Sequence, residues 1–88
     1  MNPIETIEPY RTRVNPEILE KWGGVIRVWS EPASLIDGAK VVGKITEQTE
    51  VTAIAEQKDI HGSIPERIKI RYGNRQEGWV LFETILPV

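Results

Sequence analysis

The sequence contains no cysteine among its 88 residues, and only one histidine. The absence of cysteine excludes disulfide bonds, thiolate metal sites and cysteine nucleophiles together. A carboxylate site for a hard cation would need clustered oxygens, whereas the acidic residues are scattered along the chain. The glycine pairs in "WGGV" and "IDGA" lack the spacing and the basic residue of a phosphate-binding loop. We therefore expect neither a metal nor a cofactor.

Long hydrophobic runs and an excess of one charge are also missing. No apolar run approaches the ~20 residues that cross a bilayer. Residues 1–22 lack the apolar stretch behind a basic head that marks a secretory signal. With 11 basic and 13 acidic residues the net charge is −2, which gives no indication of a nucleic-acid or membrane partner. These absences predict a cytoplasmic protein without a membrane span.

The composition that remains is typical of one small globular domain. Hydrophobic residues make up 40% of the chain and charged residues 27%, which argues against wholesale disorder. A chain of this length buries only about 60–65% of the surface that it exposes when unfolded, so the core must be small.

The first part of the chain, residues 1–24, shows no strand periodicity. Residues 1–14 carry two prolines and predict an extended arm. The stretch "NPEILEKWGG" then predicts a helix of about two turns, with Asn15 as the N-cap, Pro16 at the first position and a glycine as the left-handed stop. Such a helix is too short to be stable alone, and we expect Trp22 to pin it to the rest of the domain.

From residue 25 the hydrophobic period changes to two. Short strands bounded by turn residues are predicted at 25–29, 40–45, 50–57, 67–72 and 77–82. Five short strands without intervening helices favour an all-β fold, and we predict a small five-stranded antiparallel barrel over residues 25–88. The register of the last hairpin stays open. A three-residue loop or a bulge places Val80 beside Ile68 and Ile70, whereas a two- or four-residue loop places Trp79 there.

Two segments of this region resemble the bacterial Src-homology-3-like (SH3-like) domain family. They are "IRVWSEPASLIDGAKVVGKITEQTEVTAIAEQ" and "IKIRYGNRQEGWV", and the resemblance covers about residues 25–86. Matching positions in the opening, the second and third strands and the close are Val28, Ser30, Pro32, Val41, Val42, Gly43, Ile45, Val51, Ala53, Gly78, Trp79 and Val80.

The resemblance implies a five-stranded barrel with a binding role, commonly for cell-wall peptides or proteins, and no catalysis. It favours Val80 inside the barrel and Trp79 nearer the groove. Four positions depart from the family pattern. Trp29 replaces the usual arginine, Glu31 replaces a glycine, Gln48 replaces the usual glycine of the tight turn, and Arg67 replaces a tryptophan that often lines the ligand groove.

The candidate binding residues follow from the aromatic side chains and the predicted groove. Trp79 reads first as a core or groove residue, and for Trp29 binding and packing stay equally open. The long loops at 30–39 and 57–66 would frame the groove. The predicted partner-binding set is Trp29, Glu31, Pro32, Trp79, Tyr72, Tyr10 and Trp22.

Other polar groups have simpler interpretations. Arg67, Lys69 and Arg71 project from one face of a predicted strand, and with Arg75 they could track a phosphate backbone, but a solvated strand face is favoured. His61 stands beside Asp59 and Ser63 in one polar loop, which does not supply the rigid geometry of a catalytic triad. Glu47 and Glu50 straddle a turn where nothing shifts the pKa of either carboxyl toward neutrality. No catalytic residue is predicted.

The sequence therefore favours a non-enzymatic protein-binding module, acting as a small intracellular adaptor or as a subunit of an assembly. Residues 1–24 would lose much conformational entropy if pinned to the barrel alone, so they are predicted to lie along a partner protein. A cell-wall or peptide-binding domain is the alternative. A nucleic-acid-binding barrel is the third possibility.

Overall fold

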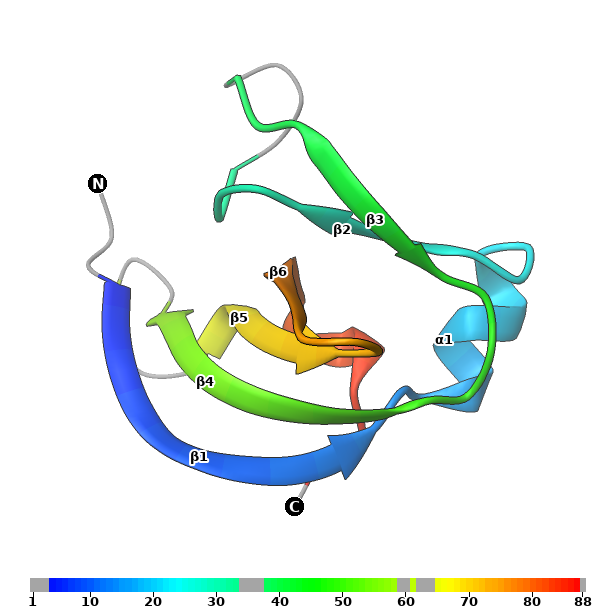
Figure 1. Ribbon diagram of the computed structural model, residues 1–88, viewed down its shortest axis with the longest axis horizontal. Helices are drawn as coiled ribbons and strands as arrows, with labels where there is room; N and C mark the ends of the chain where they lie inside the picture. The colour runs from blue at the N-terminus through cyan, green and yellow to red at the C-terminus, as the bar shows by residue number, and fades with distance from the viewer. Residues whose placement is uncertain (1–3, 34–37, 59–60, 62–64, 88) are drawn as a thin grey trace.

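The computed structural model describes residues 4–33, 38–58, 61 and 65–87. Their secondary structure is almost entirely β, arranged as one sheet with a single short α-helix at its side (Figure 1). The elements are β1 (Ile4–Arg13), α1 (Pro16–Lys21), β2 (Ile26–Trp29), β3 (Val41–Ile45), β4 (Glu50–Lys58), β5 (Pro65–Tyr72), β6 (Gln76–Leu81) and a 3₁₀ turn at Phe82–Thr84.

The sheet has six strands in the order β1-β4-β5-β6-β2-β3, and neighbouring strands pair antiparallel. The predicted all-β fold is confirmed, and each of the five predicted strands is present within two residues of its expected bounds. The predicted five-stranded closed barrel is not what the structure shows. Across the described ranges no pairing joins the end strands β1 and β3, so the curved sheet stays open between them (Figure 1).

The sixth strand is β1, which lies where the sequence predicts an extended arm. Its residues pair with β4 at both ends, from Ile4 opposite Gln57 to Arg13 opposite Glu50. The pairing is interrupted between Thr6 and Tyr10, and Pro9 lies in this irregular stretch. Because proline has no N–H to donate, it is tolerated at such an interruption of an edge strand. This segment is extended as predicted, but it is paired with β4 as a strand of this chain's own sheet.

Helix α1 follows the local signals in the sequence. The Asn15 side chain accepts a hydrogen bond from the Glu17 N–H at 3.0 Å, and Pro16 is the first helical residue. At the other end the N–H of Gly23 donates to Glu20 and that of Gly24 to Leu19, with both glycines at positive φ. This is a Schellman ending, and it satisfies two carbonyl groups that the helix leaves open.

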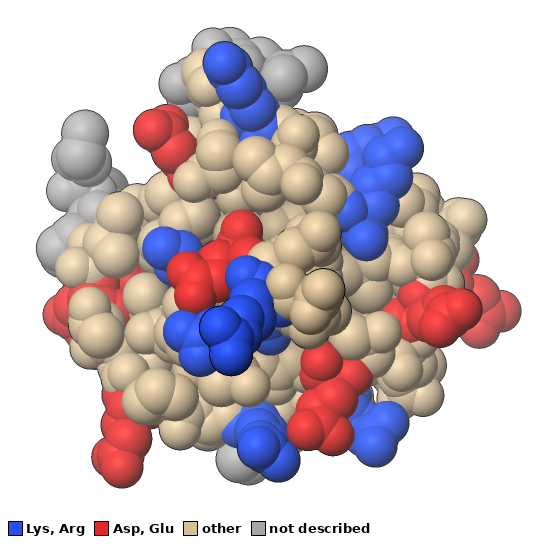
Figure 2. All heavy atoms as spheres, in the orientation of Figure 1, with Lys and Arg blue, Asp and Glu red and all other residues tan. Residues whose placement is uncertain are grey.

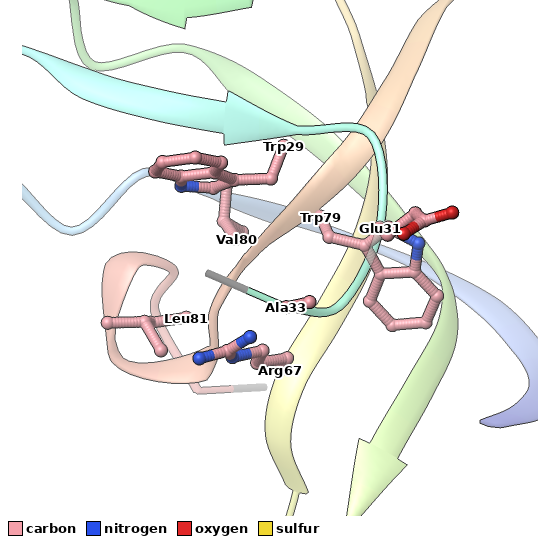
Figure 3. A pocket seen from close by; sticks show the side chains of 7 residues that line it. All are labelled: Trp29, Glu31, Ala33, Arg67, Trp79, Val80 and Leu81. Atoms are coloured by element: carbon pink, nitrogen blue, oxygen red, sulfur yellow. The ribbon is translucent and has the colours of Figure 1, made fainter. Parts of the chain in front are cut away.

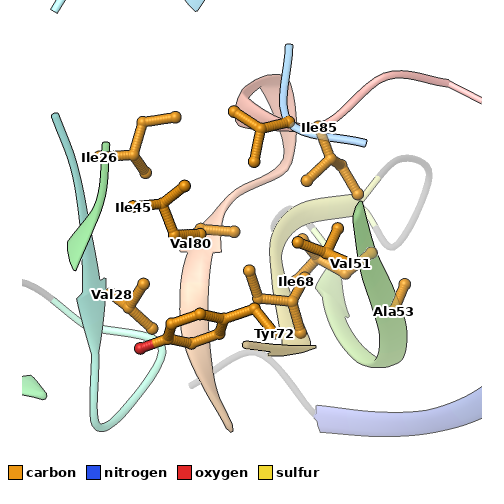
Figure 4. Close-up of a cluster of buried hydrophobic side chains, with 11 residues drawn as sticks. Ile26, Val28, Ile45, Val51, Ala53, Ile68, Tyr72, Val80 and Ile85 are labelled. Atoms are coloured by element: carbon orange, nitrogen blue, oxygen red, sulfur yellow. The ribbon is translucent and has the colours of Figure 1, made fainter. Parts of the chain in front are cut away.

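The core lies inside the curve of the sheet (Figure 4). Ile26 and Val28 from β2, Ile68 from β5 and Val80 from β6 are at most 2% exposed, and Ile7 and Tyr10 of β1 pack against this cluster. The helix contributes Leu19 to the same cluster. Trp22, predicted to pin the helix, is 36% exposed instead. Trp22 is the C-cap residue, beyond the last helical residue Lys21, and Leu19 makes the contact with the core in its place.

Residues 12–15, at the end of β1, are joined by hydrogen bonds to residues 84–86, which follow the last strand. Val14 forms a bridge with Ile85, the Asn15 N–H donates to the Thr84 carbonyl at 2.7 Å, and the Leu86 N–H donates to that of Arg13 at 2.8 Å. The Thr12 hydroxyl adds a hydrogen bond to the Leu86 carbonyl at 2.7 Å. We call residues 12–15 together with 84–86 the terminal clasp. It holds the end of β1 against the segment that follows the last strand.

Candidate functional site

The β5–β6 hairpin decides which side chains face the core and which face outward. Tyr72 pairs with Gln76, so the loop consists of residues 73–75, with Gly73 and Arg75 at positive φ. Ile68 then lies opposite Val80, and Lys69 lies opposite Trp79. Val80 belongs to the core cluster, as the three-residue loop requires. The predicted inward position of Val80 is confirmed.

On the outer face the strand register aligns a row of side chains across four strands, β5, β6, β2 and β3. Trp79 of β6 has Lys69 of β5 on one side and Trp29 of β2 on the other. Trp29 is in turn opposite Val41 on the edge strand β3, and Val41 is 39% exposed. Because directly paired residues project to the same side of a sheet, the two tryptophans belong to one surface.

Gly78 allows the strands that carry these tryptophans to approach closely. A Cβ atom at this position would collide with a methyl group of Val28 and would lie 2.9 Å from the Trp29 carbonyl oxygen. Only a glycine therefore lets β6 pass β2 at this distance. The glycine before Trp79, noted as part of the family resemblance, has a structural reason in this chain.

Two adjoining hollows open on this outer surface, and both are lined by Trp29 and Leu81. The first, of about 190 Å³, adds Glu31, Ala33, Arg67, Trp79 and Val80. The second, of about 260 Å³, adds Trp22, Val25 and Arg27. In Figure 3 the Trp29 ring lies across the first hollow from Leu81, and Arg67 reaches toward Leu81 and Ala33. We call the residues that line the two hollows the tryptophan surface.

The structure brings four of the seven predicted binding residues to this surface. Trp29, Glu31 and Trp79 line the first hollow, and Trp22 lines the second. Trp79 is 5% exposed and forms a wall, whereas Trp29 is half-buried and shared by both hollows. Pro32 stands between two lining residues but is not part of the lining. The predicted groove residues are therefore partly assembled.

The two tyrosines in the predicted set lie elsewhere. Tyr72 belongs to the core, and its ring reaches toward Val28 of β2 (Figure 4). Its pKa is raised above the ordinary value of 10.0 by burial. Tyr10 packs against the core from β1, and burial together with the nearby charge of Glu56 raises its pKa. Their period-two positions put both side chains on the inner face of the sheet.

Two of the three basic residues of β5 form ion pairs with one carboxylate. Glu77 accepts from Arg71 at 3.0 Å and lies 3.8 Å from the Lys69 ammonium. Figure 2 shows basic and acidic side chains lying next to each other near the centre of one face of the molecule. This arrangement supports the interpretation of the outer face of β5 as a solvated strand face.

Other candidate chemistry finds little support. His61 is exposed, and its predicted neighbours Asp59 and Ser63 lie outside the described residues. Within the described ranges no three histidine or acidic side chains are grouped as a metal site would require. No helix among the residues that the structure describes is long and apolar enough to cross a membrane.

Sequence reasoning did not select Arg67 and Leu81 as binding residues, although both line the first hollow. The signal was available in the two-residue period. Once Val80 is placed inside, Trp79 and Leu81 must face outward together, and Arg67 lies opposite Leu81. Arg67 thus lies on the groove-like surface, at the position where the family pattern has a tryptophan.

Comparison of the chain with protein-family models, with curated proteins and with solved structures gives no match.

Proposed function

We propose that this protein is a non-enzymatic protein-binding module and that the tryptophan surface is its recognition site. The observation that carries the proposal is the pair of hollows sharing Trp29 and Leu81. Aromatic residues and arginine dominate the energetics of protein interfaces, and Trp29, Trp79 and Arg67 combine both. The resemblance to bacterial SH3-like domains supports the same class of function.

The location of this surface supports the proposal further. Trp29 and Leu81 are on the outer face of the sheet, away from the core cluster. A half-buried tryptophan that is not needed to fill the core is available for a partner. Residues 4–13 are committed to β1, so the N-terminal segment is not proposed as the partner-binding element. We retain the cytoplasm as the proposed compartment and an adaptor or subunit as the proposed role.

Native size fractionation of host lysate tests the proposal. The protein and two variants, Trp29→Ala and Ile4→Ala, are expressed at natural level and followed by mass spectrometry. Ile4 is the matched control because it is a large apolar residue that is 55% exposed on β1. We expect the protein and Ile4→Ala to elute with the same larger species and Trp29→Ala to elute near 10.0 kDa.

Circular dichroism confirms beforehand that both variants are folded. If the unmodified protein elutes near its own mass, a stable assembly is excluded. If Trp29→Ala retains every companion, the tryptophan surface is not the recognition site.

A further inference from the structure

Two arginines of the tryptophan surface have no carboxylate partner. Glu77 forms ion pairs with Lys69 and Arg71, but no ion pair between described residues involves Arg27 or Arg67. Arg67 is also half-buried in the first hollow. A guanidinium group that loses part of its hydration without gaining a partner is costly, and a ligand carboxylate would offset that cost.

The two arginines bracket an apolar centre. Arg67 lines the first hollow and Arg27 the second, while Trp29 and Leu81 belong to both. Going across the surface, the order is therefore a cation, an apolar wall and a second cation. The hollows, of about 190 and 260 Å³, are smaller than the roughly 300–1,000 Å³ of pockets that enclose small molecules. Each suits one side chain of a larger ligand.

Among the described residues that line the two hollows only Glu31 is acidic, and it restricts where a negative group can bind. In Figure 3 Glu31 lies beside the Trp79 ring, whereas Arg67 lies toward Leu81. A ligand carboxylate is therefore attracted to the Arg67 end and repelled from the Glu31 end. This asymmetry also disfavours a nucleic-acid backbone, which carries a negative charge at every step and would meet Glu31 and Glu77 as well.

From this arrangement we infer that the tryptophan surface binds an extended peptide segment in which an apolar side chain is flanked by acidic residues. The apolar side chain packs on Trp29, and the acidic ones pair with Arg67 and Arg27. Arginine holds a carboxylate through two parallel hydrogen bonds, which gives such a site geometric specificity. The inference rests on the proposed function and names the chemical class of its partner.

A displayed library of random short linear peptides, selected on the purified full chain, tests the inference. We expect the selected peptides to share aspartate or glutamate beside an aromatic or aliphatic residue. A synthetic representative should bind Arg67→Gln or Arg27→Gln about tenfold or more weakly. Arg13→Gln is the matched control because it removes the same charge from an exposed residue of β1, outside both hollows, and it should bind as the unmodified protein does.

The outcomes separate this inference from the proposed function. Selected peptides that lack acidic residues yet require Trp29 would overturn the acidic specificity and leave the recognition site intact. Binding that Arg67→Gln and Arg13→Gln weaken equally would show only a general effect of net charge and would also overturn the inference. A selection that enriches no peptide would reject peptide recognition itself, while the size fractionation of Trp29→Ala still tests binding to a folded partner. Arg67→Lys, which keeps the charge without the planar fork, guards against misfolding of the glutamine variant.

Discussion

At the scale of single residues, Tyr72 and Gly43 depend on one another. Tyr72 is 6% exposed, and its hydroxyl is the one fully buried side-chain polar atom in the described ranges without a hydrogen-bond partner. A Cβ atom at Gly43 would collide with this hydroxyl and would lie 3.2 Å from the ring carbon that carries it. The absence of a side chain at Gly43 on β3 therefore leaves room for the Tyr72 ring from β5.

We expect Tyr72→Phe to raise the free energy of unfolding by about 1 kcal/mol, because it removes a buried hydroxyl that gains no hydrogen bond. Gly43→Ala should destabilise the protein, and by less when Tyr72 is already phenylalanine. Urea unfolding of the two single variants and the double variant measures this coupling. Equal costs of Gly43→Ala in both backgrounds would show that the contact does not exist.

Both tyrosines should make the protein lose stability in alkali. Burial raises the pKa of Tyr72, and burial together with Glu56 raises that of Tyr10, above the ordinary 10.0. Above about pH 10 the unfolded chain releases these protons while the folded chain retains them, so stability falls as pH rises. Below this pH both states are protonated, and the tyrosines contribute no pH dependence.

Urea unfolding at pH 8 and at about pH 11 checks this expectation, with lysine titration as the background. Replacing both Tyr10 and Tyr72 with phenylalanine should reduce the alkaline loss. A loss of the same size in the double variant would mean that other groups cause it.

At the scale of elements, helix α1 is stabilised by its ends. It has six residues, too few to be stable in isolation, and none of them is fully buried. The Asn15 cap and the glycine ending satisfy its terminal groups, and Leu19 attaches it to the core. The helix thus depends on interactions at a few identifiable positions.

Asn15→Ala should lower the free energy of unfolding by about 1 kcal/mol, since it removes the acceptor for the Glu17 N–H. Asn15→Ser is the matched control because its hydroxyl can accept the same hydrogen bond. The Asn15 side chain also approaches the Glu83 carbonyl at 3.5 Å, which serine cannot do. Thermal unfolding of both variants compares the contribution of the cap with that of the Glu83 contact. If Asn15→Ala and Asn15→Ser lose the same stability, the Glu83 contact accounts for the loss.

The elements differ in how well the sequence predicts them. Both ends of α1 are encoded by neighbouring residues, so the helix was predictable. The five later strands have a regular two-residue period and were predictable for the same reason. Strand β1 was predicted only as extended chain, because Pro9 interrupts its period and its partner β4 lies some forty positions away.

The candidate site shows the same division between local and non-local information. Trp29 and Trp79 could be selected by residue type. The contribution of Arg67 follows from the register of the β5–β6 hairpin, whereas that of Arg27 depended on the strand order, which places β2 beside β6 although many residues separate them. A strand order of this kind cannot be predicted from neighbouring residues in the sequence.

At the scale of the whole molecule, β1 is an integral part of the fold. Ile7 and Tyr10 pack on the core, and the terminal clasp fixes the end of the strand. A protein of this size has a small margin of stability, so the loss of a strand and its core contacts should be severe.

Deleting residues 1–13 therefore tests the role of β1 directly. We expect the shortened chain to lose cooperative thermal unfolding, because the core is opened and β4 loses its neighbour. Adding a synthetic peptide of residues 1–15 in excess should restore part of the transition by mass action. An unchanged midpoint after deletion would instead support the arm that the sequence alone suggests.

The terminal clasp also has a consequence for protein synthesis. Strand β1 is made before its neighbour β4, in which Glu50 is the partner of Arg13, and Thr12 precedes its hydrogen-bond partner Leu86 by 74 positions. Closing so long a loop costs conformational entropy, and no contact formed earlier offsets that cost. The nascent chain therefore carries β1 without its sheet partner at least until β4 has been made, and the terminal clasp can form only after residues 84–86 have emerged.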